Sequence, residues 1–144
     1  YLSVRENIAV SDTLAGRRSD QRRLEEVLSR LRLESRANSL TSTLSGGEQQ
    51  RVALGRILYR RPAIVFADEP TGALDTRSAS VVLYELRRLA DEGATVVLVT
   101  HDLNAASLAD SVMILRDGHI ISRLDSGISS EILLSIMNNA VEGE

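Results

Sequence analysis

The 144-residue sequence has no cysteine, no lysine and no tryptophan, and it contains only two prolines. Because cysteine is absent, the chain can form neither a disulfide nor a thiolate metal site, and this composition fits a reducing cytosol. All 17 basic residues are arginines. The sequence therefore cannot contain a P-loop, the glycine-rich phosphate-binding loop that ends in Lys-Ser or Lys-Thr.

Long hydrophobic runs are also missing. The longest, around residues 94–99, has the size of a strand, whereas a membrane-spanning helix needs roughly 20 apolar residues. No signal peptide opens the chain, so we expect any attachment to a membrane to pass through a partner. The net charge of −3 gives no bulk electrostatic reason to bind nucleic acid.

The residues that are present describe a soluble globular protein. Hydrophobic residues make up 43% and charged residues 26%, which is the ordinary balance of that class, and the length suits one domain with a real core. The chain begins with Tyr1 instead of Met, and residues 1–7 are typical of the interior of a protein. We therefore expect the sequence to be a fragment of a longer protein.

Helices and strands alternate along most of the chain. Apolar spacing, caps and turn residues predict helices over 20–33, 46–59, 76–92, 103–109 and 129–140, and strands over 63–67, 94–100, 112–116 and 119–123. This order predicts an α/β fold with a parallel core sheet. The runs AIVFA and ATVVLVT are continuously apolar, so we expect those strands to be buried on both faces and ligands to bind beyond their carboxyl ends.

Several details of these elements can be checked against a structure. Ser19 is expected to cap the first helix and Asp102 the short fourth one, and Gly93 is expected to follow the end of the third. Asp117-Gly118 predicts a two-residue hairpin turn. The residues expected to face inward are Leu24, Val27, Leu28 and Leu31 in the first helix, Val52, Leu54, Ile57 and Leu58 in the second, Ala79, Val82, Leu83, Leu86, Leu89 and Ala90 in the third, and Ile132, Leu133, Ile136 and Met137 in the last.

Four arginines lie close together at positions 17, 18, 22 and 23. They could form a phosphate-binding patch, but a solvated helix face is the more ordinary explanation of such a group.

Polar groups follow the two apolar strands directly. Asp68 and Glu69 come after AIVFA, and His101 comes after ATVVLVT. Asp68 has the hard oxygen ligand that Mg²⁺ prefers, Glu69 could orient or deprotonate a water that attacks a phosphoryl group, and His101 could hydrogen-bond a terminal phosphate. The alternative is that the acids cap or ion-pair with a neighbouring loop, and that the histidine is a packed or surface residue. Their shared place at strand ends favours the functional interpretation.

Ser45, Gly46 and Gly47 open the second predicted helix. A helix start presents free N–H groups and a positive dipole end, which suit an anion. Glycine lets a phosphate approach the backbone without a Cβ in the way, and Ser45 adds a hydroxyl donor. A short glycine motif alone is weak evidence, because an ordinary helix start can have the same sequence.

Together these motifs resemble those of the ATP-binding-cassette (ABC) ATPases, in the family's order and spacing over nearly the whole chain. Residues 44–51 resemble the signature motif, 64–69 the Walker B strand and 72–75 the D-loop. Residues 100–102 resemble the segment of the switch histidine, and 116–120 the hairpin that follows. The resemblance implies a partial RecA-like nucleotide-binding domain, with a helical subdomain at 1–60 and the C-terminal half of the ATPase core at 61–144. The family's P-loop and Q-loop glutamine would lie upstream of Tyr1.

The resemblance also implies a role for each motif residue. Glu69 and His101 would be catalytic, and Asp68 would hold Mg²⁺, through water, on ATP bound by the same subunit. The signature residues Ser45, Gly46, Gly47 and Glu48 would instead bind the γ-phosphate of ATP held by a second subunit, in a head-to-tail dimer. Asp75 would lie at the seam between the subunits. Two positions depart from the usual pattern: Glu48, where glutamine is common, and Gly55, where alanine is usual.

The implied partners are a second nucleotide-binding domain, identical or not, and a transmembrane permease that would hold the protein at the inner face of the cell membrane. The motifs ADEPTGALD and VTHD resemble the subgroup that exports macrolides, peptides or lipoproteins or works in cell division. A soluble ABC ATPase acting on ribosomes or DNA is the alternative. Gly72-Ala73 before Leu74-Asp75 is unlike the ribosome-acting members, and the chain leaves no room for the long insertion of the DNA-repair members. A third possibility is that the chain, in isolation, is inactive because it has no P-loop.

Overall fold

The computed structural model describes residues 2–125 and 128–142. Tyr1, in the predicted helical subdomain, and residues 143–144, in the predicted half of the ATPase core, lie outside the described residues. By its contacts the chain divides into two compact units, 1–97 and 98–144, which are described separately. The predicted division after residue 60 stays a prediction.

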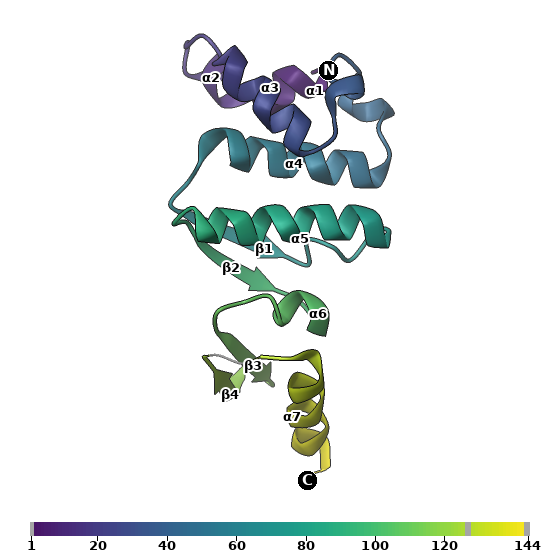
Figure 1. The fold of residues 1–144 in the computed structure, drawn as a ribbon, viewed down its shortest axis with the longest axis vertical. Helices are drawn as coiled ribbons and strands as arrows, with labels where there is room; N and C mark the ends of the chain where they lie inside the picture. The colour runs from purple at the N-terminus through teal and green to yellow at the C-terminus, as the bar shows by residue number, and fades with distance from the viewer. Residues whose placement is uncertain (1, 126–127, 143–144) are drawn as a thin grey trace. The chain divides into compact units, whose positions relative to one another are not determined.

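The first unit consists mostly of helices around one apolar core. Its elements are α1 (Val4–Ile8), α2 (Val10–Leu14), α3 (Gln21–Arg30), the 3₁₀ turns η1 (Glu34–Arg36) and η2 (Thr41–Thr43), α4 (Gly46–Arg60), β1 (Ile64–Asp68) and α5 (Thr76–Asp91), followed by β2 (Thr95–Val99), which runs into the second unit. In Figure 1, α4 separates the small helices α1–α3 from α5, and the strands lie on the far side of α5. The core is continuous from Ile8 and Leu28 through Val52 to Val82 and Val65.

The apolar stripes of α3, α4 and α5 are confirmed. Leu24, Val27, Leu28 and Leu31 are buried, as are Val52, Leu54, Leu58, Val82, Leu86 and Leu89, and Ile57 packs against the same core. The predicted cap of α3 is wrong by one residue. Asp20, not Ser19, accepts from the N–H of Arg23 at 3.1 Å, because a cap must stand two or three residues before the donor that it satisfies.

Gly55 in the middle of α4 is explained by close packing. A Cβ at this position would lie 2.9 Å from both Cδ1 and Cγ1 of Ile8 and 3.1 Å from Cδ1 of Leu31. Both neighbours have no exposed surface, so they have no free space into which to move. The glycine lets α4 approach α1, at the cost of a weaker helix.

The prediction that the two apolar strands are buried on both faces is wrong for this structure. β1 and β2 form a two-stranded sheet, and the connection through α5 is the kind that parallel neighbours need. Val65 is buried with the apolar residues of α5, but Ile64 is 56% exposed and Phe66 78% exposed. Within the described residues no layer covers this second face, so only alternate residues enter the core.

The second unit contains α6 (Leu103–Ala106), the hairpin of β3 (Val112–Arg116) and β4 (His119–Leu124), and α7 (Ser130–Glu142). The hairpin is confirmed: β3 and β4 are antiparallel, and Asp117 and Gly118 both have positive φ, 52° and 78°, as a type I′ turn requires. Asp102 caps α6, as predicted, by accepting from the N–H of Asn104 at 2.9 Å.

The inward face predicted for α7 is only partly correct. Leu133 is 1% exposed and Ile136 is half-buried, but Ile132 and Met137 are exposed by 44% and 42%. The reason is that the second unit is small, so only one narrow stripe of the apolar residues of α7 packs against other residues. Among the described residues, no helix is both long enough and apolar enough to cross a bilayer.

Candidate functional site

The signature residues lie at the start of α4, where they form a capping box. The Oγ of Ser45 accepts from the N–H of Glu48 at 3.3 Å, and the Glu48 carboxylate accepts in return from the N–H of Ser45 at 2.9 Å. Arg36 donates to the other Glu48 oxygen at 3.0 Å. The bond from the Ser45 N–H is the largest cause that holds the pKa of Glu48 below its ordinary value of 4.5, and the contact with Arg36 adds to it. The carboxylate is thus engaged within its own chain.

Two backbone donors at this helix start are left over. The capping box uses the N–H groups of Ser45 and Glu48, and the N–H of Gln49 bonds to the Ser45 carbonyl at 2.9 Å. Residues 2–125 and 128–142 supply no acceptor for the N–H groups of Gly46 and Gly47. Since Ser45 and Gly46 are exposed, an anion can reach these donors at the positive end of the helix dipole.

The two glycines have different surroundings. No atom lies within 4 Å of the place where a Cβ of Gly46 would be, so the space there is open. At Gly47 a Cβ would lie 2.9 Å from the Oγ of Ser78, in the first turn of α5. Gly46 therefore leaves room for a ligand, while Gly47 allows the start of α4 to rest on the start of α5.

Hydrogen bonds join this helix start to the D-loop and to the end of β1. Arg51 donates from Nη1 to Ser78 Oγ at 3.0 Å, and Ser78 donates to Oδ2 of Asp75 at 2.7 Å. Gln50 donates from Nε2 to the carbonyl of Pro70 at 3.2 Å. Asp75 was predicted from the sequence, Gln50 only as a member of the signature motif without a role, and Ser78 not at all, because tertiary hydrogen bonds of this kind leave no periodic signal.

Asp75 is also the N-cap of α5. Its Oδ1 accepts from the N–H groups of Arg77 and Ser78, both at 3.0 Å. The hydrogen bonds with Ser78 are the largest causes that lower the pKa of Asp75 from its ordinary value of 3.8. The carboxylate is therefore ionised at neutral pH and is fixed at the start of the helix.

The acidic pair closes β1. Asp68 is the last residue of the strand and is exposed, while Glu69 is half-buried. Glu69 has φ +43°, in the left-handed region, which costs a non-glycine residue on the order of 1–3 kcal/mol and is most common at functional sites. The carbonyl of Glu69 accepts from the N–H of Gly72 at 3.2 Å, and a Cβ on Gly72 would lie 4.0 Å from Oε2 of Glu69. Because Asp68 is exposed, its charge is solvated and does not itself require a bound cation.

His101 follows β2 and is exposed. It belongs to the second unit, whereas the acidic pair and the signature residues belong to the first. A common site for His101 and Glu69 therefore stays a prediction.

A complete metal centre made by the protein alone is not found in the described part of the chain, which contains no group of three or more His, Cys, Asp or Glu residues suited to a metal ion. The exposed carboxylate of Asp68 fits the alternative mode, in which Mg²⁺ takes one protein oxygen and completes its shell with water and substrate phosphates.

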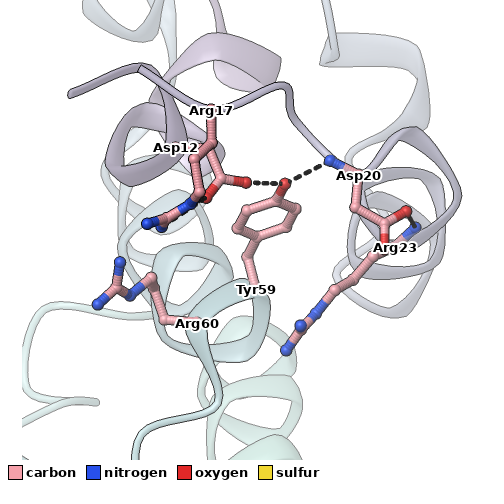
Figure 2. Close-up of a pocket in the computed structure, with 6 residues that line it drawn as sticks. All are labelled: Asp12, Arg17, Asp20, Arg23, Tyr59 and Arg60. Atoms are coloured by element: carbon pink, nitrogen blue, oxygen red, sulfur yellow. Dashed lines mark hydrogen bonds and ion pairs between the residues drawn. The ribbon is translucent and has the colours of Figure 1, made fainter. Parts of the chain in front are cut away.

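The arginines at 17 and 23 line a pocket of about 250 Å³ at the other end of α4, shown in Figure 2. At its centre the buried hydroxyl of Tyr59 donates to Oδ2 of Asp12 at 2.6 Å and accepts from the N–H of Asp20 at 2.8 Å. Arg17 pairs with Asp12 at 3.0 Å, and the Arg23 guanidinium carbon lies 5.5 Å from the centre of the Tyr59 ring. These local partners of Arg17 and Arg23 favour a structural role over a phosphate patch.

Comparison with known proteins places these features in a family. A family model described as "ABC transporter" matches residues 1–72. The chain is 41% identical over 137 residues to the macrolide export ATP-binding/permease protein MacB of Pasteurella multocida, a match over 94% of this chain and 21% of that protein. The MacB of Agrobacterium fabrum is 49% identical over 123 residues, which are 84% of this chain and 19% of that protein. The chain thus spans about a fifth of the length of these relatives.

Solved structures show the same fold. The dimeric post-hydrolysis state of the ATP-binding cassette MJ0796, bound to ADP and Pi, has 35% sequence identity and a TM-score of 0.74 over 86% of this chain and 56% of that chain. An ATP-binding subunit of an ABC transporter has 26% identity and a TM-score of 0.76 over 95% of this chain and 62% of that one. The predicted α/β cassette fold, present in part, is confirmed.

Proposed function

The chain belongs to the ABC transporter family, and on that premise we propose that it is part of an ATP-hydrolysing subunit whose signature helix acts on ATP held by a second subunit. The observation that carries the proposal is at the exposed start of α4, where the N–H groups of Gly46 and Gly47 have no acceptor in the described part of the chain. Ser45 Oγ accepts from the N–H of Glu48, and in this proposal its hydroxyl proton turns from the Glu48 carboxylate to the anion. Three donors thus converge on one anion, a γ-phosphate in this proposal.

The acidic pair works on the nucleotide of its own subunit. The carboxylate of Asp68 would hold Mg²⁺, through water, and a bound ion would supply positive charge next to the nucleotide phosphates. Glu69 accepts a proton from the attacking water or orients it. The N–H of Gly72 donates to the carbonyl of Glu69 at 3.2 Å, so the left-handed backbone of Glu69 is tied to the D-loop.

The remaining motif residues are His101 and Asp75. By its resemblance to the family's switch histidine, His101 would hydrogen-bond a γ-phosphate of ATP. Asp75 lies at the seam of a head-to-tail dimer. Asp75 accepts a hydrogen bond from Ser78, which accepts one from Arg51 of the signature helix. These bonds support a connection between the two nucleotides that the dimer would hold.

The small helices receive a transmembrane permease, which holds the subunit at the inner face of the cell membrane. A pocket of about 310 Å³ between α1, η2 and α4, lined by Asn7, Thr41, Ser42, Gln49, Val52 and Arg56, offers a place for an inserted helix. Asn7 Oδ1 is buried there without a hydrogen-bond partner in the described chain. The name of the MacB relatives joins ATP binding and a permease in one protein, which supports a permease as part of the same protein and leaves the separate subunit a proposal. Export is the transport class that we propose.

The test is the rate of ATP hydrolysis by the whole protein that carries this chain. The variant Glu69→Gln should abolish phosphate release while it still binds ATP, because the amide accepts no proton from water. Glu26→Gln, at an exposed position of α3, is the matched control and should hydrolyse ATP normally. Hydrolysis that survives Glu69→Gln would disprove the assignment of the general base.

The 144-residue chain alone is inactive in this proposal, because without lysine it has no P-loop to hold the phosphates. The rate of phosphate release from ATP should equal that of buffer without protein. If the chain released phosphate and Glu69→Gln stopped it, a nucleotide would be bound in some other way.

A further inference from the structure

We propose that Ser78 is a positioning residue for phosphate binding at the start of α4, an inference that rests on the function proposed above. Ser78 reaches no ligand itself. It joins the signature helix to the D-loop, so that the N–H groups of Gly46 and Gly47 keep a fixed direction relative to Asp75.

The first argument is contact. The Cβ position of Gly47 lies 2.9 Å from Ser78 Oγ and 3.4 Å from Ser78 Cβ, so the backbone of α4 rests directly on this side chain. Ser78 is 7% exposed. A buried hydroxyl in contact with the helix backbone defines where the first turn of α4 can lie.

The second argument is the chain of hydrogen bonds. Ser78 Oγ accepts from Arg51 Nη1 at 3.0 Å and donates to Asp75 Oδ2 at 2.7 Å. One end of this chain is a cation on α4 and the other is the carboxylate that caps α5, so the hydroxyl uses its donor and one acceptor position between two charges. Bonds of this charge-assisted kind are shorter and stronger than neutral ones.

The third argument is that Arg51 has little else to hold it. Its Nε is buried and has no hydrogen-bond partner in the described chain, an arrangement that is normally unfavourable. The bond to Ser78 is therefore a main restraint on this guanidinium. Because Arg51 stands four residues after Gly47, one turn further along the same face, the restraint acts on the turn that carries the glycines.

The experiment uses the whole protein with Glu69→Gln, in which the ATP-bound dimer should accumulate. Light scattering gives the ATP concentration at half-maximal dimerisation. A fluorescent ATP analogue gives the ATP affinity of each subunit's own P-loop, measured at protein concentrations too low for dimerisation. Ser78→Ala should raise the ATP concentration at half-maximal dimerisation about tenfold, which is the typical effect of losing a hydrogen bond to a charged group. The ATP affinity of the P-loop should stay unchanged.

Ser80→Ala is the matched control. Ser80 lies two residues further along α5, is exposed, and donates only to the Thr76 carbonyl at 2.8 Å, so its removal should change neither quantity. If Ser78→Ala and Ser80→Ala dimerise at the same ATP concentration, the inference is wrong. A loss of P-loop affinity in Ser78→Ala would also contradict it, since the role would then be general stability.

Arg51→Met is the second variant, because it breaks the same hydrogen-bond chain and leaves the cap on α5 in place. It should shift dimerisation as Ser78→Ala does, and the double variant should be no worse than either. Effects that multiply would show that Arg51 and Ser78 act separately, against the inference. If the Glu69→Gln parent itself fails to dimerise with ATP, the proposed function fails, which distinguishes the two cases.

Discussion

Gly55 in α4 faces Ile8 in α1 so closely that a Cβ on the glycine would meet two carbons of the isoleucine at 2.9 Å. Alanine is the residue that helix propensity favours here, by about 1 kcal/mol. Overpacking of a rigid core costs typically about 1–3 kcal/mol, so Gly55→Ala should destabilise the protein by about 1 kcal/mol in urea unfolding.

The background variant Ile8→Ala tests the cause. It removes the two nearest carbons and leaves only Leu31 Cδ1 at 3.1 Å, so the addition of Gly55→Ala to it should cost clearly less than in the unchanged protein. An equal cost in both backgrounds would show that Ile8 is not the reason for the glycine.

Arg30 in α3 and Glu85 in α5 form a buried ion pair, with side chains 11% and 3% exposed. The Arg30 Nε donates to Glu85 Oε2 at 2.9 Å. Glu85→Gln removes the close counter-charge of the Arg30 guanidinium, leaves only the longer pair with Glu92 at 3.8 Å, and should cost about 3 kcal/mol of unfolding free energy. Arg30→Met combined with Glu85→Leu should recover most of that loss, because an apolar pair needs no charge compensation.

The matched control for this pair is Asp91→Asn. It breaks the exposed pair of Arg87 and Asp91 on the same helix and should change stability by less than about 0.5 kcal/mol. A Glu85→Gln effect as small as the control's would contradict the importance of burial.

Asp12 connects acid stability to Tyr59. The hydrogen bond from the Tyr59 hydroxyl, and after it the contact with Arg17, hold the pKa of Asp12 below its ordinary 3.8. A lowered folded-state pKa contributes stability above pH 3.8 that is lost as the pH falls through the folded value. Tyr59→Phe should raise the pKa of Asp12 in an NMR titration and weaken the loss of stability below pH 3.8. An unchanged titration would disprove the coupling.

Phe66 tests the uncovered face of the β1–β2 sheet. Phe66 is 78% exposed in this chain, and exposed apolar patches promote association. Phe66→Ser should leave the unfolding free energy of the chain within about 0.5 kcal/mol and reduce its self-association in light scattering. Leu86→Ala, in the core facing the other side, should instead destabilise by about 2–5 kcal/mol.

The sequence predicted best what local chemistry decides. The apolar stripes of α3 to α5 and the Asp117-Gly118 turn depend on spacing and on backbone preference, and both are confirmed. The α3 cap failed because Ser19 and Asp20 are both good caps, and only the structure shows which one meets the Arg23 N–H.

Features that depend on distant contacts were not predictable. An apolar run such as AIVFA says that a strand can be buried, not how many of its faces are covered, and Phe66 shows the difference. The motif residues Gly46 and Gly47 could be picked from the sequence, but Ser78 could not, because its meaning comes from Arg51 and Asp75 in space.

The most direct test of the central claim is the ATP-driven dimerisation of the Glu69→Gln protein with and without Ser45→Arg. The arginine side chain would fill the space before the N–H groups of Gly46 and Gly47, for which the described residues supply no acceptor. We predict that Ser45→Arg stays monomeric in ATP, with ATP affinity unchanged, while the parent dimerises. A Ser45→Arg variant that dimerises as readily as its parent would contradict the binding of a neighbour's phosphate at this helix start.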